Sequence, residues 1–520
     1  MDFVTSSYNQ LRTVVEKTPS DALPPNEAIV KAVESLPSSL PSHGLGEQAT
    51  QTHLLTDIVP GFNGPKTGSN YYGFVTGGVL PIAEVADNIV TAFDQNVQVH
   101  LPTQSISTFV EDKALSLTAE LVHLPDGFRG RTFTTGATGA NILGLACARE
   151  SVLNARLQAA GDRGEVAELG LLSACLKAGV KEIQVLSSMG HSSLYKAASI
   201  IGLGRSSVKD LPYSKDEPWR IDFVALESHL QRAKEGVVSI VAISAGEVNT
   251  GRFATDGLSQ NGRIRDLCDK YDAWFHVDAA FGLFARSLPP TPEFQSLILS
   301  SSGLELADSI AGDCHKMLNV PYDCGIFFTS HPAILTAVFQ NANAAYLSTG
   351  PAAIPSPLNN GMENSRRLRA LPVYAVLLAH GRDGLAQIFA KQVRLARAVS
   401  AFIDTHPSYE LLAQTPSPAP PSHPSYYHHL SLTSPQPTGT NTPIERPPYE
   451  DTHVVVIFRA KDERVNRRLV ESINGGRKIY VSGTQWQGRK ACRIAISTWK
   501  VDVGRDLELM RRVLGEVVKV

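Results

Sequence analysis

The sequence has few cysteines and no excess of either charge. Its 520 residues include six cysteines, and no two of them form a CxxC pair. So few thiols in so long a chain argue against a disulfide framework and favour a reducing compartment. Lys and Arg number 48 and Asp and Glu 50, so the formal net charge is −2. This balance predicts that neither nucleic acid nor an anionic membrane surface is a partner.

Long apolar runs are also missing. The longest buried-looking run, Gly236 to Gly246, has the length of a strand. A membrane-spanning helix needs about 20 apolar residues. The first residues lack the basic and then apolar profile of a secretory signal. We therefore expect a cytoplasmic protein with no membrane partner.

The length of the chain and the distribution of proline suggest the domain organisation. A chain of 520 residues is too long for one ordinary core. Prolines break a helical arm over about the first 45 residues, and we expect an N-terminal helical segment at 1–95. A large domain is expected at 96–375 and a small domain at 376–520. A proline-rich stretch at 415–448 cannot build a core and is interpreted as an insertion in the small domain.

Two adjacent histidines, His428 and His429, lie in this insertion. They could suggest a metal site, but no carboxylate or thiol shell accompanies them. The alternative interpretation is a solvated loop, and we adopt it, so no metal is expected.

Short apolar runs alternate with amphipathic segments between about residues 130 and 330. Continuous apolar strands that alternate with helices predict an α/β fold with a mostly parallel sheet covered on both faces. The strands are expected at 131–135, 182–188, 237–244, 273–280, 308–313 and 324–330. After the insertion, a small α+β domain is expected, with strands at 453–460, 478–483 and 490–498 and a closing helix at 505–520. In such sheets ligands bind beyond the carboxyl ends of the strands, so the residues there are the candidate site.

The segment WFHVDAAFG, residues 274–282, places Asp278 at the end of an apolar strand. A buried carboxylate is costly unless it is paired. One suitable partner is a protonated pyridine nitrogen, because an Asp there keeps the ring cationic. Ala280 lies on the same face and is small enough for a flat ring to lie against it. The alternative interpretation of Asp278 is a cap of the next helix.

The segment DCHKMLNVPYDCG, residues 313–325, places Lys316 among apolar neighbours after another strand. Desolvation lowers the pKa of a lysine, and a lysine tuned in this way suits Schiff-base chemistry. A surface lysine on a turn is the structural alternative.

Two further segments end strands with residues that could hold a cofactor. TTGATGANILGLACARE, residues 134–150, is a turn of small residues that opens a helix, and such a turn can bind phosphate. SSMGHSS, residues 187–193, presents His191, which could stack on an aromatic ring. Glycine-rich turns are common and a lone histidine is often structural, so each signal is weak by itself.

Together these segments identify a known family. The chain resembles the group II decarboxylases that depend on pyridoxal 5'-phosphate (PLP), the family of glutamate, aromatic-amino-acid and histidine decarboxylases. The resemblance extends from about residue 65 to 515, and HVDAAFG and DCHKMLNVPYDCG are its most specific parts. The segments NYYGFVTGG, AFDQN, SAGEVNTG and TQWQGRKACRIAISTW look closest to a branch of the family whose substrates are poorly defined.

The resemblance implies a fold-type I PLP enzyme that acts as a homodimer with its active sites at the dimer interface. It assigns the Schiff base to Lys316, the pyridine nitrogen to Asp278 and the stacking role to His191. It also places Ala137 and Thr138 at the phosphate, with His315 near it. Substrate contacts are implied for Arg493, whose alternative is a surface arginine on a strand, and for Phe74 and Thr76 in the pocket.

Two departures from the family pattern affect these expectations. Relatives often carry GTT where this chain has Gly246-Glu247-Val248, and Asn249 is expected to supply the ring-oxygen contact instead. Aromatic decarboxylases also carry a mobile loop whose tyrosine protonates the carbanionic intermediate. The matching stretch, residues 348–367, is shorter and contains no tyrosine. Another group, with His191 as one candidate, would then deliver that proton.

The function expected from the resemblance is decarboxylation of an L-amino acid to an amine and CO2. The missing tyrosine keeps a second outcome open, namely oxidative decarboxylation to an aldehyde or another lyase reaction. A third hypothesis is a PLP-fold protein that has lost activity and binds a partner, and the intact Lys316, Asp278 and His191 argue against it. The sequence does not indicate which amino acid is the substrate.

Overall fold

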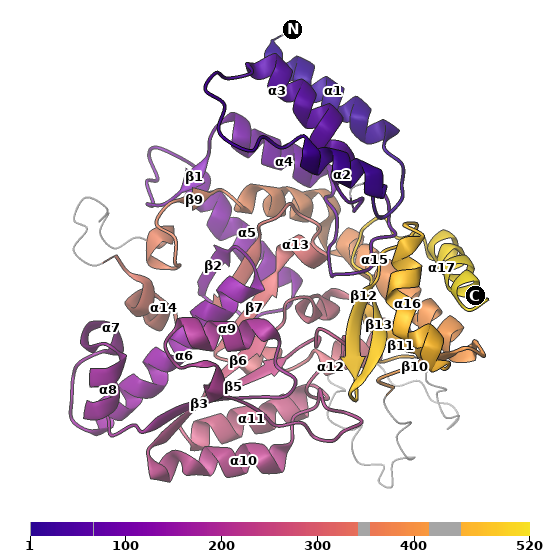
Figure 1. Cartoon of the computed structure of the whole chain (residues 1–520). Helices are drawn as coiled ribbons and strands as arrows, with labels where there is room; N and C mark the ends of the chain where they lie inside the picture. The colour runs from indigo at the N-terminus through magenta and orange to yellow at the C-terminus, as the bar shows by residue number, and fades with distance from the viewer. Residues whose placement is uncertain (1, 66, 342–353, 415–448, 520) are drawn as a thin grey trace, which may run out of the picture.

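A seven-stranded sheet forms the centre of the computed structural model, which describes residues 2–65, 67–341, 354–414 and 449–519 (Figure 1). The strand order is β2-β8-β7-β6-β5-β3-β4. The strands are β2 (Gly130–Thr134), β3 (Glu182–Ser187), β4 (Val208–Asp210), β5 (Val237–Ser244), β6 (Trp274–Asp278), β7 (Ser309–Asp313) and β8 (Gly325–Thr329). Neighbours from β4 to β7 pair in parallel, and β8 runs antiparallel to both β7 and β2. The predicted α/β fold with a mostly parallel sheet is confirmed, and β4 is an additional strand.

Both faces of this sheet are covered, which explains why its strands are almost completely buried. Every residue of β5 is buried. Alternate residues of β5 enter different cores, with Val241 and Ile243 in one and Ile240 and Ala242 in the other. Helix α6 (Ala137–Ala159) packs on strands β5 to β8. Helix α6 begins near the carboxyl ends of the parallel strands β6 and β7, where Ala137 contacts Asp313 and Asn141 contacts Asp278.

A second, four-stranded antiparallel sheet lies toward the C-terminus (Figure 1). Its order is β10-β11-β13-β12, with bounds β10 (Tyr409–Leu411), β11 (Val455–Ala460), β12 (Ser482–Trp486) and β13 (Arg489–Ala495). Helices α16 (Glu463–Gly475) and α17 (Val503–Val517) pack there around a separate apolar core. The expected α+β region is confirmed, but the strand expected at 478–483 was misplaced. Ile479 and Val481 are buried in the loop before β12, so their alternation reflects burial and not a strand.

Helices surround and connect the two sheets. The long helix α15 (Ala370–Thr405), which is interrupted by a kink at Gly381, packs against α4 (Pro81–Ala92), α5 (Ser107–Leu121) and α17 and joins the two regions. The other helices are α1 (Phe3–Lys17), α2 (Asn26–Glu34), α3 (Glu47–His53), α7 (Val166–Leu169), α8 (Leu171–Lys177), α9 (Ser192–Ile200), α10 (Phe223–Gln231), α11 (Leu258–Lys270), α12 (Gln295–Ser300), α13 (Cys314–Met317) and α14 (Pro332–Phe339). In Figure 1, α1, α2 and α3 gather at one end of the molecule, and neither α1 nor α2 buries a residue. Across the described ranges, no helix has the length and apolar character required to cross a bilayer.

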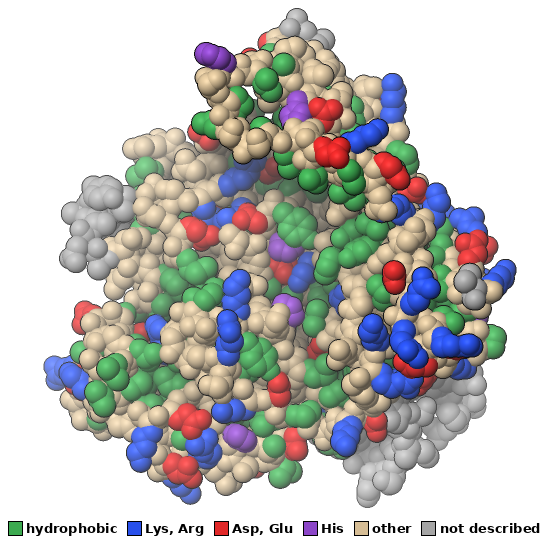
Figure 2. All heavy atoms as spheres, viewed as in Figure 1, with side chains coloured by type: hydrophobic (Ala, Val, Ile, Leu, Met, Phe, Trp, Pro, Cys, Tyr) green, Lys and Arg blue, Asp and Glu red, His purple; other side chains and the backbone are tan. Residues whose placement is uncertain are grey.

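The surface carries both charges, interspersed. Figure 2 shows Lys and Arg side chains beside Asp and Glu on the face viewed, in keeping with the balance of charges in the sequence. The same face is hollowed between the central sheet and the four-stranded sheet (Figure 2). His428 and His429 of the proline-rich stretch lie outside the described residues.

His453 is a buried histidine behind the candidate site, and it should make the protein sensitive to acid. Its ring stacks on Phe281, with centroids 6.1 Å apart, and neither ring nitrogen has a hydrogen-bond partner among the described residues. Burial lowers the pKa of His453 from 6.5 to about 3. Between these two values the unfolded chain binds a proton that the folded chain excludes, so stability falls as the pH drops below 6.5.

We expect His453→Leu to remove this part of the acid sensitivity. Urea unfolding at pH 7 and pH 5 would show a smaller loss of unfolding free energy in the variant, by roughly 2 kcal/mol, because one pKa unit corresponds to about 1.4 kcal/mol. At pH 7 the variant should be no less stable, since it replaces an unpaired polar ring with an apolar side chain. Equal losses in the two proteins would contradict this explanation.

Candidate functional site

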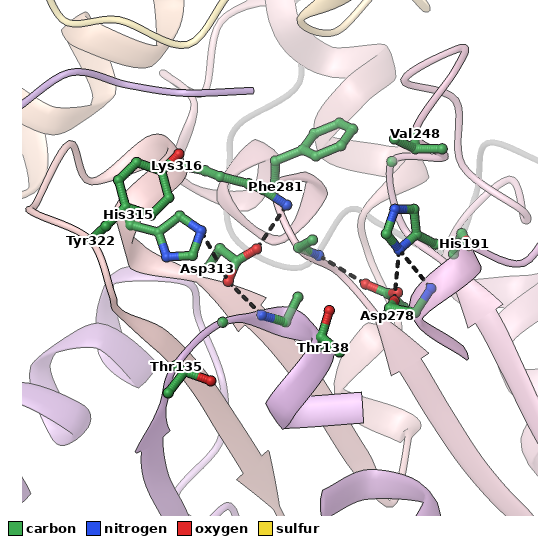
Figure 3. Close-up of a pocket in the computed structure, with 16 residues that line it drawn as sticks. Thr135, Thr138, His191, Val248, Asp278, Phe281, Asp313, His315, Lys316 and Tyr322 are labelled. Carbon is green, nitrogen blue, oxygen red and sulfur yellow. Dashed lines mark hydrogen bonds and ion pairs between the residues drawn. The ribbon is translucent and has the colours of Figure 1, made fainter. Parts of the chain in front are cut away.

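A cavity of about 360 Å³ opens at the carboxyl ends of β5, β6 and β7, beside the start of α6 (Figure 3). It brings together residues that are far apart in the sequence. Seven of the predicted site residues line it: Ala137, Thr138, His191, Asp278, Ala280, His315 and Lys316. The apolar Val248 and Phe281 also line the cavity. The rule that ligands bind beyond the strand ends therefore located the site correctly.

Asp278 ends β6 and is 8% exposed. One of its carboxylate oxygens accepts a hydrogen bond from the side-chain amide of Asn141 at 2.8 Å. The other receives a long contact from the Ala280 N–H at 3.4 Å. The next helical turn begins at Gly282 and has no side-chain cap, so Asp278 is not the helix cap that was its alternative interpretation. Its second oxygen faces the cavity and can accept a strong hydrogen bond there.

A chain of hydrogen bonds fixes the orientation of the Asn141 side-chain amide, which donates to Asp278. The carboxylate can only accept, so the amide nitrogen of Asn141 faces it and the amide oxygen faces His276 Nε2, 3.0 Å away. His276 Nδ1 lies 2.8 Å from the Ser309 hydroxyl, which in turn accepts from the indole N–H of Trp274. Burial lowers the pKa of His276 to about 4. The ring is therefore neutral at pH 7, with its proton on Nε2, and it locks the orientation of Asn141.

The side-chain amide of Asn141 also influences which nitrogen of His191 carries the proton. The second N–H of this amide donates to the Ser193 hydroxyl at 3.0 Å. His191 precedes α9, and its Nδ1 accepts from the Ser193 backbone N–H at 3.2 Å and lies 2.7 Å from the Ser193 hydroxyl. With Nδ1 as acceptor, the ring proton resides on Nε2, which points away from Ser193 (Figure 3). His191 thus caps a helix and also presents an N–H to the cavity.

Lys316 lies in the one-turn helix α13, directly after β7. Its ammonium forms an ion pair with Asp313 at 2.7 Å and lies 5.9 Å from the centre of the Phe281 ring. It points into the cavity (Figure 3), so it is not the surface lysine that was its alternative interpretation.

The turn at the start of α6 borders the cavity, and the Ala137 N–H at this helix N-terminus donates to the Asp313 carboxylate. The helix begins at Ala137, and Gly136 before it supplies no side-chain cap. A Cβ atom at Gly136 would lie 3.3 Å from the His315 ring and 3.5 Å from Asp313, so glycine keeps this corner open. The His315 ring lies against the Tyr322 ring at a tilt, with ring centres 4.3 Å apart, and burial lowers the pKa of His315. These features form a cradle that is suited to a small anion.

Asn249 does not line the cavity. Its backbone and side-chain N–H groups both donate to Glu247, and the Thr484 hydroxyl donates to its side-chain oxygen at 2.6 Å. Glu247 is 2% exposed, and burial raises its pKa. The neighbouring Gly246 and Val248 reach the cavity in its place. The ring-oxygen contact expected of Asn249 stays a prediction.

The three predicted substrate residues do not line the cavity, although Arg493 contacts Val248, which does. Arg493 of β13 is 5% exposed and donates to the carbonyls of Val248 and Gly73 at 2.7 and 2.9 Å. It is therefore not a surface arginine, and burial lowers its pKa to about 10. Phe74 is 54% exposed beside Tyr480, and the Thr76 hydroxyl is buried without a hydrogen-bond partner among the described residues.

The sequence analysis did not predict several residues of the site. These residues line the cavity or contact the predicted site residues, and they are Asn141, Ser193, Phe281, Asp313 and Tyr322. Position 313 begins the segment that contains Lys316, but its contact with Ala137 spans 176 residues. Of the tyrosine-free stretch 348–367, residues 348–353 lie outside the described part of the chain. The remainder ends at β9 (Arg366–Arg367), where Arg366 forms a buried, two-pronged ion pair with Glu111.

Comparisons with known proteins agree with this geometry. The family model described as "Pyridoxal-dependent decarboxylase conserved domain" matches residues 75–419. The chain is 27% identical over 411 residues to the aromatic-L-amino-acid decarboxylase of Sus scrofa, a match that covers 76% of this chain and 71% of that protein. It is 26% identical over 348 residues to the L-2,4-diaminobutyrate decarboxylase of Acinetobacter baumannii, covering 64% of this chain and 63% of that protein.

Solved structures share the fold at low sequence identity. The structure of Oryza sativa TDC with PLP and tryptamine has a TM-score of 0.77 at 20% identity, covering 99% of this chain and 96% of that one. The structure of Rhodiola rosea 4-hydroxyphenylacetaldehyde synthase has a TM-score of 0.74 at 18% identity, also covering 99% and 96%. The arrangement of two sheets and connecting helices is thus a known one.

Proposed function

Because the chain belongs to the pyridoxal-dependent decarboxylase family and its cofactor is PLP, we propose that it decarboxylates an L-amino acid to an amine and CO2, with Lys316 as the Schiff-base lysine. One observation carries the proposal. A lysine, a buried carboxylate, a histidine and a helix N-terminus, from four separate segments, meet in one cavity. These are the groups that bind the aldehyde, the ring nitrogen, the ring face and the phosphate of this cofactor.

The residues of the cavity fit PLP in size and in chemistry. The open corner at Gly136 and the N–H groups of Ala137 and Thr138 suit a phosphate, with His315 beside it. Asp278 has one oxygen held by Asn141 and one directed at the cavity, as a partner for a pyridine N–H. Ala280 offers a small side chain for one face of a flat ring, and His191 an aromatic ring for the other.

PLP supplies an electron sink for the pair of electrons that is left when CO2 departs. The protein supplies position and charge. Asp278 keeps a positive charge on the ring nitrogen, and Asn141 holds that carboxylate in place. His191 lines the cavity, and its Nε2 N–H can donate a hydrogen bond to the substrate carboxylate and orient it. Val248 and Phe281 form an apolar wall that limits the access of water to the reacting carbon.

The amine requires a proton on the carbon that CO2 leaves, and several groups that line the cavity can carry one. Among them are the Lys316 ammonium, the His191 N–H and the Tyr322 phenol. Tyr322 is 61% exposed, but partial desolvation and the nearby Asp313 carboxylate raise its pKa to about 12, so this phenol keeps its proton at neutral pH. A proton donor at the site favours the amine over an aldehyde, even though the stretch 348–367 contains no tyrosine.

We expect product analysis to distinguish the two outcomes. The purified protein, loaded with PLP, would be incubated with a panel of acidic, aromatic and aliphatic L-amino acids. CO2 and amine in equal amounts are expected with at least one of them. Aldehyde, ammonia and peroxide in place of the amine would favour the oxidative route, which is the second candidate because a structural neighbour is named an aldehyde synthase.

We also propose that the protein is a cytoplasmic homodimer with the N-terminal helices at its interface. Helices α1 and α2 bury no residue within one chain. Val30, Val33 and Leu36 are more than half exposed there, and burial of such an apolar surface would favour association. The mass of the protein in solution tests this proposal, and a monomer at micromolar concentration would contradict it.

A further inference from the structure

The carboxylate of Asp313 occupies the centre of the cradle at the start of α6 (Figure 3). Asp313 ends β7 and is 2% exposed. One oxygen accepts from the backbone N–H of Ala137 at 2.6 Å, and the other lies 2.7 Å from the Lys316 ammonium. The first oxygen also lies 3.6 Å from His315 Nε2.

These contacts involve the same groups that the cofactor requires. The N–H of Ala137 is the first donor of a helix of 23 residues, where the phosphate would bind under the site assignment proposed above. Lys316 is the amine that would hold the aldehyde. The Asp313 carboxylate therefore already binds the Ala137 N–H and the Lys316 ammonium, the two groups that the cofactor would need.

We propose that Asp313 is a built-in competitor of the cofactor phosphate, which can bind only after the carboxylate has released Ala137. The proposal rests on the proposed site, and it assigns to Asp313 a weakening of cofactor binding. Two anions that share one cradle repel each other, and the repulsion is strong where water is excluded. Cofactor loading then becomes readily reversible, so the fraction of active protein would follow the supply of PLP.

The charges that face Asp313 do not remove this conflict. From α13 it faces the Lys316 ammonium and the His315 ring, and from the following loop the Tyr322 phenol. Burial is the largest effect on His315 and lowers its pKa, which disfavours a second cation at neutral pH. From α6 it meets the neutral N–H of Ala137. Lys316 is thus the single cation in direct contact with Asp313 among the described residues.

The test is a titration of the full-length protein with PLP and, in parallel, with pyridoxal, which lacks the phosphate. Asp313→Asn keeps the shape of the side chain and an oxygen for Ala137 but removes the charge. We expect its Kd for PLP to fall at least tenfold below that of the natural protein, and its Kd for pyridoxal to change less than threefold. Inorganic phosphate alone, titrated into the protein without PLP, should also bind the variant with a Kd about tenfold lower than that of the natural protein.

Asp323→Asn is the matched control, because Asp323 is a carboxylate of the same segment that pairs with Arg369 and touches neither Ala137 nor Lys316. Its Kd for PLP should stay within threefold of the natural value. Asp313→Ala is a second variant without the charge and should also bind PLP more tightly. The inference is overturned if both Asp313 variants fold, as judged by thermal unfolding, and bind PLP no more tightly than the natural protein. An equal gain for pyridoxal would also overturn it.

Failure of the site assignment gives a different result. Borohydride reduction of the loaded natural protein would then leave no pyridoxyl group on Lys316, and the proposed function would fall together with this inference. If Lys316 is labelled and Asp313→Asn binds no tighter, the role of Asp313 alone is wrong.

Discussion

Lys316→Ala is expected to abolish covalent attachment of PLP and to lower turnover by on the order of a thousandfold. The side chain is the one amine that lines the cavity among the described residues. Without it the aldehyde has no partner, and the substrate amine must react with a free aldehyde at a loosely positioned cofactor. The loaded variant should lack the absorption band of an imine in the visible region, while its phosphate contacts still retain PLP.

Lys177→Ala provides the control for this substitution. Lys177 is half-exposed and pairs with Asp162 at 2.9 Å on the surface, where an ion pair contributes little. Its spectrum and turnover should match those of the natural protein. Turnover of Lys316→Ala within tenfold of the natural rate would show that another residue holds the cofactor.

Asp278→Asn is expected to leave PLP attached to Lys316 but to lower kcat by roughly 10²–10³-fold, the range found when one preorganised electrostatic partner is removed. The amide has nearly the shape of the carboxylate but no negative charge, so it cannot keep a proton on the ring nitrogen. The electron sink is then weaker. A single-turnover measurement of CO2 release should show the decrease in the chemical step, with a small change in the Kd for PLP.

Asp506→Asn is a suitable control because Asp506 is also a buried carboxylate, 1% exposed, and lies outside the cavity. It accepts hydrogen bonds from Ser69 and Arg505 at 2.8 Å. The Asp506→Asn substitution should lower the free energy of unfolding without a change in the rate of CO2 release. If Asp278→Asn released CO2 within twofold of the natural rate, Asp278 would not be the partner of the ring nitrogen.

The parts of the fold that the sequence predicted well are those whose signal is local. In the run that becomes β5, six of the eight residues are apolar and all eight are buried, because both sheet faces are covered. Strand β4, with three residues and only Val208 buried, leaves no such pattern. The misplaced strand at 478–483 shows the opposite case, since Ile479 and Val481 are buried by contacts with distant segments.

The same distinction applies to the site. Asp278 and Lys316 were found because each follows an apolar strand and lies in a specific segment. Asn141 was missed because an amide in the second turn of a helix has no meaning until β6 places Asp278 and His276 against it. Asp313 was missed for the same reason, since Ala137 meets it only after the sheet has formed.

The most direct test of this account is borohydride reduction of the PLP-loaded protein, followed by peptide mapping with mass spectrometry. The account predicts a reduced pyridoxyl group on Lys316, in the peptide that also contains Asp313 and His315. A pyridoxyl group on another lysine, or a protein that takes up no PLP, would contradict it.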